Sequence, residues 1–280
     1  MSRLLLPGSI LRLGRLAAAL AVVLLLVPAC SSSDDDDAYV ERPVEELYND
    51  ALDAMLAGDY MRSARLFDEV ERQHPYSNWA SKAQIMAAFA YYQANSYDDA
   101  INALDRFIQL HPGNPDVAYA YYLKALSYYE QISDVRRDQK MTERALQSLD
   151  ELTRRFPESK YARDGLLKMD LARNHLAGKH MEIGRFYQNH GEYLAAINRF
   201  RMVVQDHQTT THVPEALHRL VECYLALGLS EEAQATAAVL GHNFPGSPWY
   251  TDSYALLTGV DLRPEEDKQS WIASVWNSVF

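Results

Sequence analysis

Cysteine, glycine, proline and positive charge are all scarce in this 280-residue chain. Two cysteines cannot build a disulfide framework, so the fold must depend on packing. There are 12 glycines and 11 prolines. Because these residues punctuate turns, their shortage disfavours a fold of many short strands and favours long helices. The formal charge is −11 and no basic stripe is present, which argues against a nucleic-acid partner.

The N-terminal segment of the chain is first basic and then apolar. Arg3, Arg12 and Arg15 precede an unbroken apolar run over residues 16–27, which is the order of a secretory signal. This run is too short to cross a bilayer, which takes about 20 apolar residues. The run ends at Val27-Pro28-Ala29-Cys30, which resembles the lipobox of bacterial lipoproteins. That resemblance implies a signal peptide over 1–29 and lipidation of Cys30; the alternative is an ordinary cleaved signal with an incidental cysteine.

Residues 30–43 are expected to form a lipidated, flexible tether. Three serines and four consecutive aspartates follow Cys30, and adjacent carboxylates on a flexible segment favour a solvated linker over a cation site. Removing residues 1–29 takes away three arginines and no acid, so the charge goes from −11 to −14. Anionic lipid repels such a surface, and membrane attachment must therefore depend on acyl chains. By the sorting pattern of enteric bacteria, Ser31 after the lipidated cysteine favours the outer membrane.

A unit of two helix-periodic apolar segments recurs from Val44 onward. Its second segment ends in an aromatic residue or His, usually Pro, and a polar pair, as at His74-Pro75, His111-Pro112, Phe156-Pro157, His207-Gln208 and Phe244-Pro245. Twelve residues before each Pro, or before Gln208, stands a small residue: Ser63, Ala100, Ala145, Ala196 and Ala233. This pattern resembles the tetratricopeptide repeat, a helix–turn–helix unit in which small residues let two helices approach. It predicts an all-α superhelix of about five repeats.

The repeat spacing is irregular in two places. The intervals between the small residues are 37, 45, 51 and 37 residues. The extra residues of the 45-residue interval fall near 131–140, in a polar corner. Those of the 51-residue interval lie in a stretch without proline, which predicts one helix over about 161–189 and adds roughly 20 Å of length. We therefore expect repeats 1–3 over 44–159, and the long helix with repeats 4–5 over 160–259.

The lipobox, the polar tether, the five repeats and the enlarged third corner together resemble the BamD family, lipoproteins of the outer-membrane β-barrel assembly machinery. The run from Tyr161-Ala162-Arg163-Asp164 through Phe186-Tyr187 to Ala195-Ala196-Ile197-Asn198-Arg199 belongs to this resemblance. It implies a scaffold on the periplasmic face of the outer membrane, beside other assembly lipoproteins. Its N-terminal half would engage unfolded outer-membrane protein clients, and its C-terminal half would dock a POTRA domain of the central barrel subunit.

Two groups of residues carry these implied roles. Asn198-Arg199 matches an Asn-Arg of the family, in which the Arg is implicated in an ion pair with the POTRA domain. A planar guanidinium suits that role because it pairs a carboxylate bidentately; on the residues alone, the alternative is a solvated helix arginine. For the client region, His74 stands where family members can carry Tyr. Tyr76 and Trp79 nearby offer aromatic contact, with stacking into the next repeat as the alternative for both.

The C-terminal tail, residues 260–280, has a pattern of its own. Pro264, followed by Glu265 and Glu266, indicates a helix start. Apolar residues then follow at helical spacing: Trp271, Ile272, Val275, Trp276, Val279 and Phe280. Such an amphipathic tail would either pack against the last repeat or act as an arm for another subunit or the membrane surface.

No motif in the sequence indicates catalysis, a metal, a cofactor or a small-molecule substrate. His175 and His180 are five residues apart, which is the wrong helical spacing for a zinc pair and favours surface histidines. Cys223 is expected to be a buried small residue on a helix. The sequence therefore predicts a binding scaffold. The alternatives are another periplasmic repeat lipoprotein, coordinating cell-envelope or peptidoglycan processes, and a murein-cleaving enzyme built on a helical solenoid.

Overall fold

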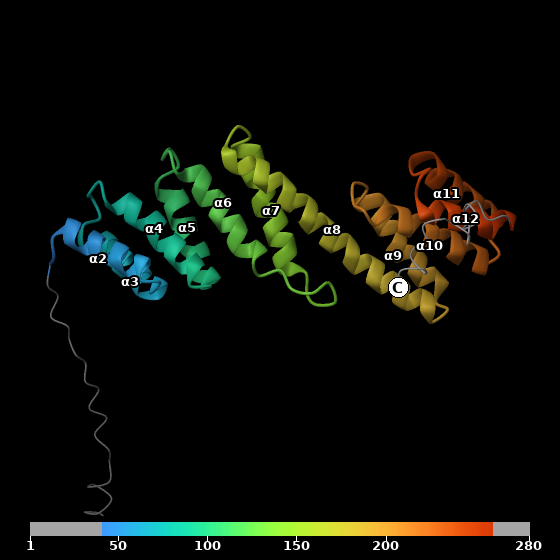
Figure 1. Cartoon of the computed structure of the whole chain (residues 1–280), viewed down its shortest axis with the longest axis horizontal. Coiled ribbons are helices and arrows are strands. Elements are labelled where there is room, and N and C mark those ends of the chain that lie inside the picture. The colour runs from blue at the N-terminus through green and yellow to red at the C-terminus, as the bar shows by residue number, and fades with distance from the viewer. Residues whose placement is uncertain (1–40, 260–280) are drawn as a thin grey trace, which may run out of the picture. The chain divides into compact units, whose positions relative to one another are not determined.

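The computed structural model describes residues 41–259. The predicted signal peptide, Cys30, the tether up to residue 40 and the tail 260–280 lie outside the described residues. Across 41–259 the regular structure consists of α-helices, labelled α2 to α12 in Figure 1, without a strand. The all-α prediction is confirmed. None of the described helices is both long enough and apolar enough to span a membrane.

Ten of these helices form five pairs of sequential neighbours, and successive pairs stack along the chain (Figure 1). The pairs are α2 (Val44–Leu56) with α3 (Tyr60–Gln73), α4 (Ala80–Gln93) with α5 (Tyr97–Leu110), α6 (Val117–Tyr129) with α7 (Lys140–Arg155), α8 (Lys160–Asn189) with α9 (Tyr193–Asp206), and α10 (Val213–Ala226) with α11 (Ser230–Asn243). The eleventh helix, α12 (Pro248–Thr258), packs on α10 and α11. The predicted superhelix of five tetratricopeptide-type repeats is confirmed.

The small residue predicted in each second helix lies at the contact between the paired helices. All five are completely buried: Ser63, Ala100, Ala145, Ala196 and Ala233. In the first pair the hydroxyl of Ser63 also donates a hydrogen bond of 2.8 Å to the carbonyl of Ala51 on the facing helix. The absence of a larger side chain at these points is what allows the helices to pack closely.

The second helix of every pair ends with the same backbone geometry. The terminal residue has φ between −134° and −129° and ψ between 44° and 56° at His74, His111, Phe156, His207 and Phe244. Its N–H donates to the carbonyl four residues earlier, which closes the last turn. The ring can then cover the end of the helix pair, as Phe156 does against Tyr121, with 5.4 Å between ring centroids.

Four of the five corners within the pairs turn on a residue with positive φ. These residues are Gly58, Asn95, Gly191 and Gly228, with φ between 58° and 79°. This left-handed conformation favours glycine or asparagine, which explains their place two residues after the first helix ends. The remaining corner, residues 130–139 between α6 and α7, is the enlarged one that the repeat spacing predicts.

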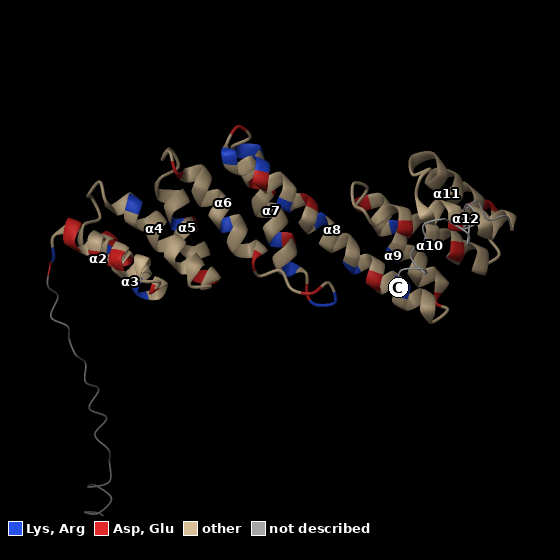
Figure 2. Ribbon diagram, viewed as in Figure 1, with Lys and Arg blue, Asp and Glu red and all other residues tan. Residues whose placement is uncertain are grey.

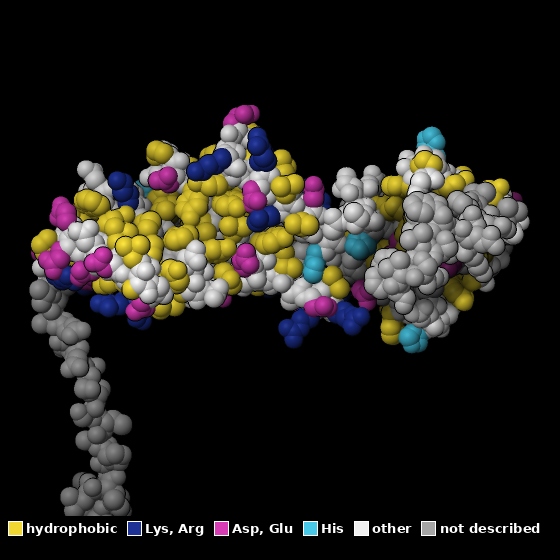
Figure 3. All heavy atoms as spheres, in the orientation of Figure 1, with side chains coloured by type: hydrophobic (Ala, Val, Ile, Leu, Met, Phe, Trp, Pro, Cys, Tyr) yellow, Lys and Arg dark blue, Asp and Glu magenta, His cyan; other side chains and the backbone are white. Residues whose placement is uncertain are grey.

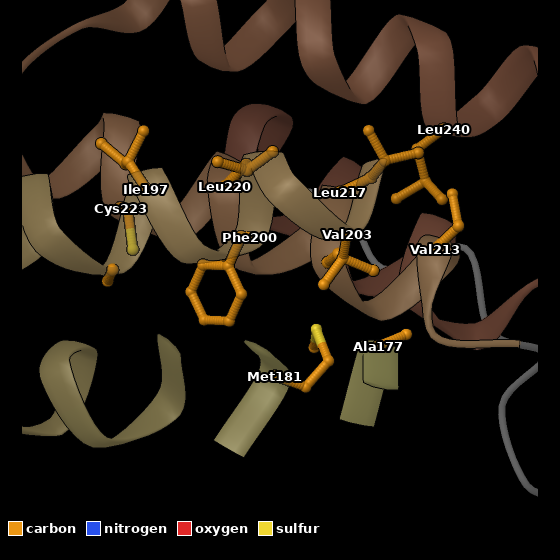
Figure 4. Close-up of a cluster of buried hydrophobic side chains, with 12 residues drawn as sticks. Ala177, Met181, Ile197, Phe200, Val203, Val213, Leu217, Leu220, Cys223 and Leu240 are labelled. Carbon is orange, nitrogen blue, oxygen red and sulfur yellow. The ribbon is translucent and has the colours of Figure 1, made fainter. Parts of the chain in front are cut away.

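The long helix α8 belongs to both groups of repeats. Near its beginning, Met169 packs with Leu149 of α7. Further along, Ala177 and Met181 enter the core that α8 shares with α9, α10 and α11, around the completely buried Phe200 (Figure 4). The predicted continuous helix over about 161–189 is confirmed. Its 30 residues therefore connect the N-terminal repeats with the C-terminal ones.

Cys223 also lies in the C-terminal core, as its place in the sequence predicts (Figure 4). Burial raises the pKa of its thiol to about 12. The thiol therefore remains protonated at neutral pH and serves as a small apolar group rather than as a nucleophile.

Candidate partner-binding site

The enlarged corner between α6 and α7 carries charges of both signs (Figure 2) and is hydrogen-bonded to α8. The Lys179 ammonium on α8 donates hydrogen bonds of 2.9 and 3.2 Å to the carbonyls of Arg136 and Arg137. Inside the corner, the buried amide of Gln139 lies within hydrogen-bond distance, 3.1 to 3.3 Å, of the carbonyls of Asp134, Val135 and Arg137. These bonds hold the two arginines of the corner beside α8, and the side chain of Arg136 also pairs with Glu182 of α8 at 3.6 Å.

A cavity of about 500 Å³ opens where this corner meets α8 and α9. Four cationic side chains line it: Arg136, Arg137, Lys179 and Arg199. The acidic side chains at its walls are Asp138 and Glu143, and Leu176 and Ile183 supply an apolar part. Because cations outnumber carboxylates, the cavity, which we call the Arg199 pocket, favours a negatively charged group.

Arg199 has no carboxylate within ion-pair distance among residues 41–259, and the same holds for Arg137 across the pocket. The Nη1 atom of Arg199 lies 4.0 Å from the sulfur of Met202. By contrast, Arg185 pairs with both Glu182 and Glu215 at 2.7 Å. The half-buried guanidinium of Arg199 thus retains its hydrogen-bonding capacity for a group from outside the described structure.

Asn198 precedes Arg199 on α9, and His180 faces the same pocket from α8. Asn198 is exposed on α9. His180 lines the pocket from α8, and its ring centroid lies 5.7 Å from that of His207. Burial, together with the positive charge of Arg199 and repulsion from His207, lowers the pKa of His180 below its usual value. At neutral pH the His180 ring is therefore uncharged, and the arginines and Lys179 supply the positive charge.

The histidines of α8 are less exposed than the sequence predicts. His175 and His180 were expected on the surface, but both are half-buried, because the enlarged corner and the next repeat cover part of this side of α8. In the described part of the chain, no group of three His, Cys, Asp or Glu side chains is placed to hold a metal ion.

A second charged cluster joins α8 to the last pair of helices. Glu222 on α10 accepts a hydrogen bond of 2.8 Å from Gln188 on α8 and another of 2.8 Å from Arg219. Burial alone would raise the pKa of Glu222. Hydrogen bonds from His218, Gln188 and Arg219 outweigh that effect and lower it to about 2. These contacts tie α8 to α10, so the helix that carries Lys179 and His180 is held in place.

The three residues predicted to meet clients differ in burial. His74 ends α3 and is half-buried, whereas Tyr76 in the corner that follows is 100% exposed. Trp79, at the start of α4, packs back on Tyr48 of the first helix, with 4.7 Å between ring centroids. Trp79 therefore contributes mainly to the core between α2 and α4, and Tyr76 is the side chain of the three that is open to a partner.

The sequence does not reveal that Arg136, Arg137 and Lys179 converge on Arg199. They lie 20 to 63 residues before it, and a corner without periodic pattern gives no indication of where it folds. The sequence does show that this corner is longer than the others and that it contains two adjacent arginines. It shows that the corner is polar without showing which helix it touches.

Comparison with known proteins places the chain in a family. The family described as YfiO, outer membrane lipoprotein, matches residues 40–240. The outer membrane protein assembly factor BamD of Caulobacter vibrioides is 53% identical over 226 residues, which cover 81% of this chain and 74% of that protein. BamD of Rickettsia prowazekii is 46% identical over 215 residues, covering 77% and 86%. BamD of Neisseria meningitidis serogroup A is 35% identical over 221 residues, covering 75% and 83%.

Among solved structures, the TPR domain of P58(IPK) is similar with a TM-score of 0.40 and 16% identity, over 76% of this chain and 55% of that one. So loose a likeness carries no argument about function. The family match covers most of the helical repeats described above, and the relatives are similar over three quarters or more of the chain. The chain therefore belongs to the BamD family of outer membrane lipoproteins.

Proposed function

We propose that this chain is a non-enzymatic scaffold of the outer-membrane β-barrel assembly machinery, held at the periplasmic face of the outer membrane by lipid on Cys30. Family membership supports the assembly role. The stacked helix pairs support the scaffold role, because a repeat superhelix offers extended surfaces to partners. The predicted charge of −14 for the processed chain disfavours direct binding to anionic lipid, which is why attachment is assigned to the acyl chains.

The Arg199 pocket is the proposed docking site for the POTRA region of the central barrel subunit. The observation that carries this assignment is the Arg199 guanidinium, which has no carboxylate partner among residues 41–259 and lies in a cavity with three further cations. A carboxylate of the partner would pair with Arg199 bidentately, and Asn198 beside it offers an amide for a further hydrogen bond. Lys179 and the corner arginines then add long-range attraction for an acidic surface.

The N-terminal half is the proposed binding region for unfolded clients. Hydrophobic side chains gather over α4 to α7 on the face shown in Figure 3. Exposed apolar side chains also mark the ends of its helices, with Leu56 85% and Leu110 59% exposed, and Tyr76 stands in the corner before α4. An unfolded outer-membrane protein presents aromatic and aliphatic residues, which such surfaces bind by burying apolar area.

A charge reversal at Arg199 tests the docking site. We expect Arg199→Glu to reduce recovery of the central barrel subunit at least about tenfold in a pull-down from detergent-solubilised outer membrane, since loss of about 1.4 kcal/mol weakens binding tenfold. The matched control is Arg201→Glu, which makes the same charge change two residues further along α9, at an exposed position outside the pocket. Equal recovery with wild type and Arg199→Glu would contradict the docking site. Failure of the wild type to recover the subunit would contradict the assembly role.

A further inference from the structure

The four cations of the Arg199 pocket are not equally available to a partner. The Arg136 guanidinium already pairs with Glu182 of α8, and the Lys179 ammonium already donates to two carbonyls of the corner. Arg137 and Arg199, by contrast, have no carboxylate within ion-pair distance among residues 41–259. The pocket therefore presents two guanidinium groups whose donors are open to an incoming group.

These two arginines reach the pocket from separate elements. Arg137 is exposed in the corner of residues 130–139, and Arg199 is half-buried on α9. The helix α8 packs against both α7 and α9 and lines the same cavity with Leu176 and Ile183. Those two residues are seven positions apart, which corresponds to about 10 Å along a helix. The cavity is thus longer than a single carboxylate.

The acidic side chains of the pocket leave both guanidinium groups unpaired. One oxygen of Asp138 accepts a hydrogen bond of 3.3 Å from the backbone N–H of Lys140. Neither Asp138 nor Glu143 lies within ion-pair distance of Arg137 or Arg199 in the described part of the chain. Both arginines can therefore bind an acidic group from a partner without first giving up an ion pair of their own.

We propose that the Arg199 pocket binds two carboxylates of its partner, one on Arg199 and the other on Arg137. This inference rests on the proposed docking of the central barrel subunit, to which it adds a second contact residue and the chemistry of the partner surface. A carboxylate that pairs bidentately with Arg199 turns both oxygens toward that guanidinium, which leaves Arg137 for another carboxylate.

The two arginines would also select between partners. A surface with a single acidic residue would leave one guanidinium desolvated and unpaired when the pocket is covered, and an unpaired charge at an interface lowers affinity. A surface with two acidic residues pairs both guanidinium groups. Arg137 is therefore a specificity-determining residue, and the enlarged corner that carries it contributes directly to recognition.

A double-mutant cycle between Arg137→Gln and Arg199→Gln tests the two-carboxylate assignment. We expect each substitution in the full-length chain to weaken binding of the detergent-solubilised central barrel subunit by about tenfold. The double variant should bind about a hundredfold more weakly, because separate ion pairs contribute independently. Added salt should weaken binding of the wild type by a larger factor than binding of the double variant, which lacks both ion pairs.

Two further variants separate direct contact from general attraction. Arg136→Gln, at the adjacent corner position, should weaken binding less than Arg137→Gln, because the Arg136 guanidinium is already paired with Glu182. Arg144→Gln, at an exposed position of α7 outside the pocket, should leave binding unchanged. Thermal unfolding should give the same melting temperature for Arg137→Gln and wild type, because Arg137 is exposed and unpaired among residues 41–259.

Three results would overturn the second carboxylate. One is wild-type affinity in Arg137→Gln while Arg199→Gln binds more weakly. Another is a double variant that binds no more weakly than the single variants, which would mean that both arginines share one carboxylate. The third is an equal loss in Arg136→Gln and Arg137→Gln, which would indicate general attraction only. Wild-type affinity in Arg199→Gln would instead contradict the docking site itself, so the two failures are distinguishable.

Discussion

At the scale of single residues, Glu222 shows how buried charge contributes to the C-terminal repeats. Its carboxylate joins α8 to α10 through Gln188 and is held ionised by donors on three side chains. Its pKa is lowered from 4.5 to about 2 in the folded chain. Its stabilising effect is therefore complete above about pH 4.5 and is lost as the pH falls through 2.

Glu222→Gln should remove this contribution. A depression of that size corresponds to about 3 kcal/mol, so we expect the variant to lose up to that amount of unfolding free energy at pH 7. The difference from wild type should shrink as the pH approaches 2, because the wild-type carboxyl is then protonated as well. Chemical denaturation at several pH values measures it. Glu158→Gln, at an exposed corner position, is the control. A difference that persists unchanged at pH 2 would contradict the electrostatic origin.

The role of a residue could be predicted only where that residue recurs at the same position of each repeat. The five small residues and the five helix-terminal rings were predicted because each repeats with the unit, and all ten lie as expected. The half-buried state of His175 and His180 could not be predicted, since a corner more than 30 residues away covers them. Trp79 illustrates the same limit, because its partner Tyr48 lies in another helix.

At the scale of helices, close approach of α8 and α9 depends on Gly184. A Cβ at this position would lie 2.4 Å from a ring carbon of the buried Phe200. Gly184→Val should therefore overpack the contact and destabilise the chain by about 2 kcal/mol. Gly113→Val, in the open corner between α5 and α6, is the matched control because no atom lies within 4 Å of its Cβ position. Thermal unfolding compares the two. Equal melting temperatures would show that α8 and α9 are not in close contact at Gly184.

The helices themselves were largely predictable, whereas the arrangement of the third corner was not. Apolar residues at helical spacing and the absence of proline determine where helices run, including the 30-residue α8. The path of residues 130–139 depends on hydrogen bonds between Lys179 or Gln139 and backbone carbonyls. Such bonds leave no periodic trace in a sequence. The Arg199 pocket, which this corner completes, therefore became visible only in the structure.

At the scale of the whole molecule, α8 connects two groups of repeats with different surfaces. The N-terminal group offers apolar side chains, and the C-terminal group shares the cationic Arg199 pocket with the third corner. Repeat proteins are stabilised mainly between neighbouring units, so a partner at one group need not disturb the other. We propose that this separation allows a client and the central barrel subunit to be held at the same time.

We propose above that the pocket beside Arg199 faces the central barrel subunit in the assembled machinery. A photo-crosslinking amino acid at the exposed position of Asn198 tests it in living cells, with the exposed position of Gln234 on α11 as the control. We expect an adduct between position 198 and the barrel subunit and a much weaker one from position 234. Absence of this adduct at position 198, in cells where the chain is correctly localised, would contradict docking of the barrel subunit at this pocket.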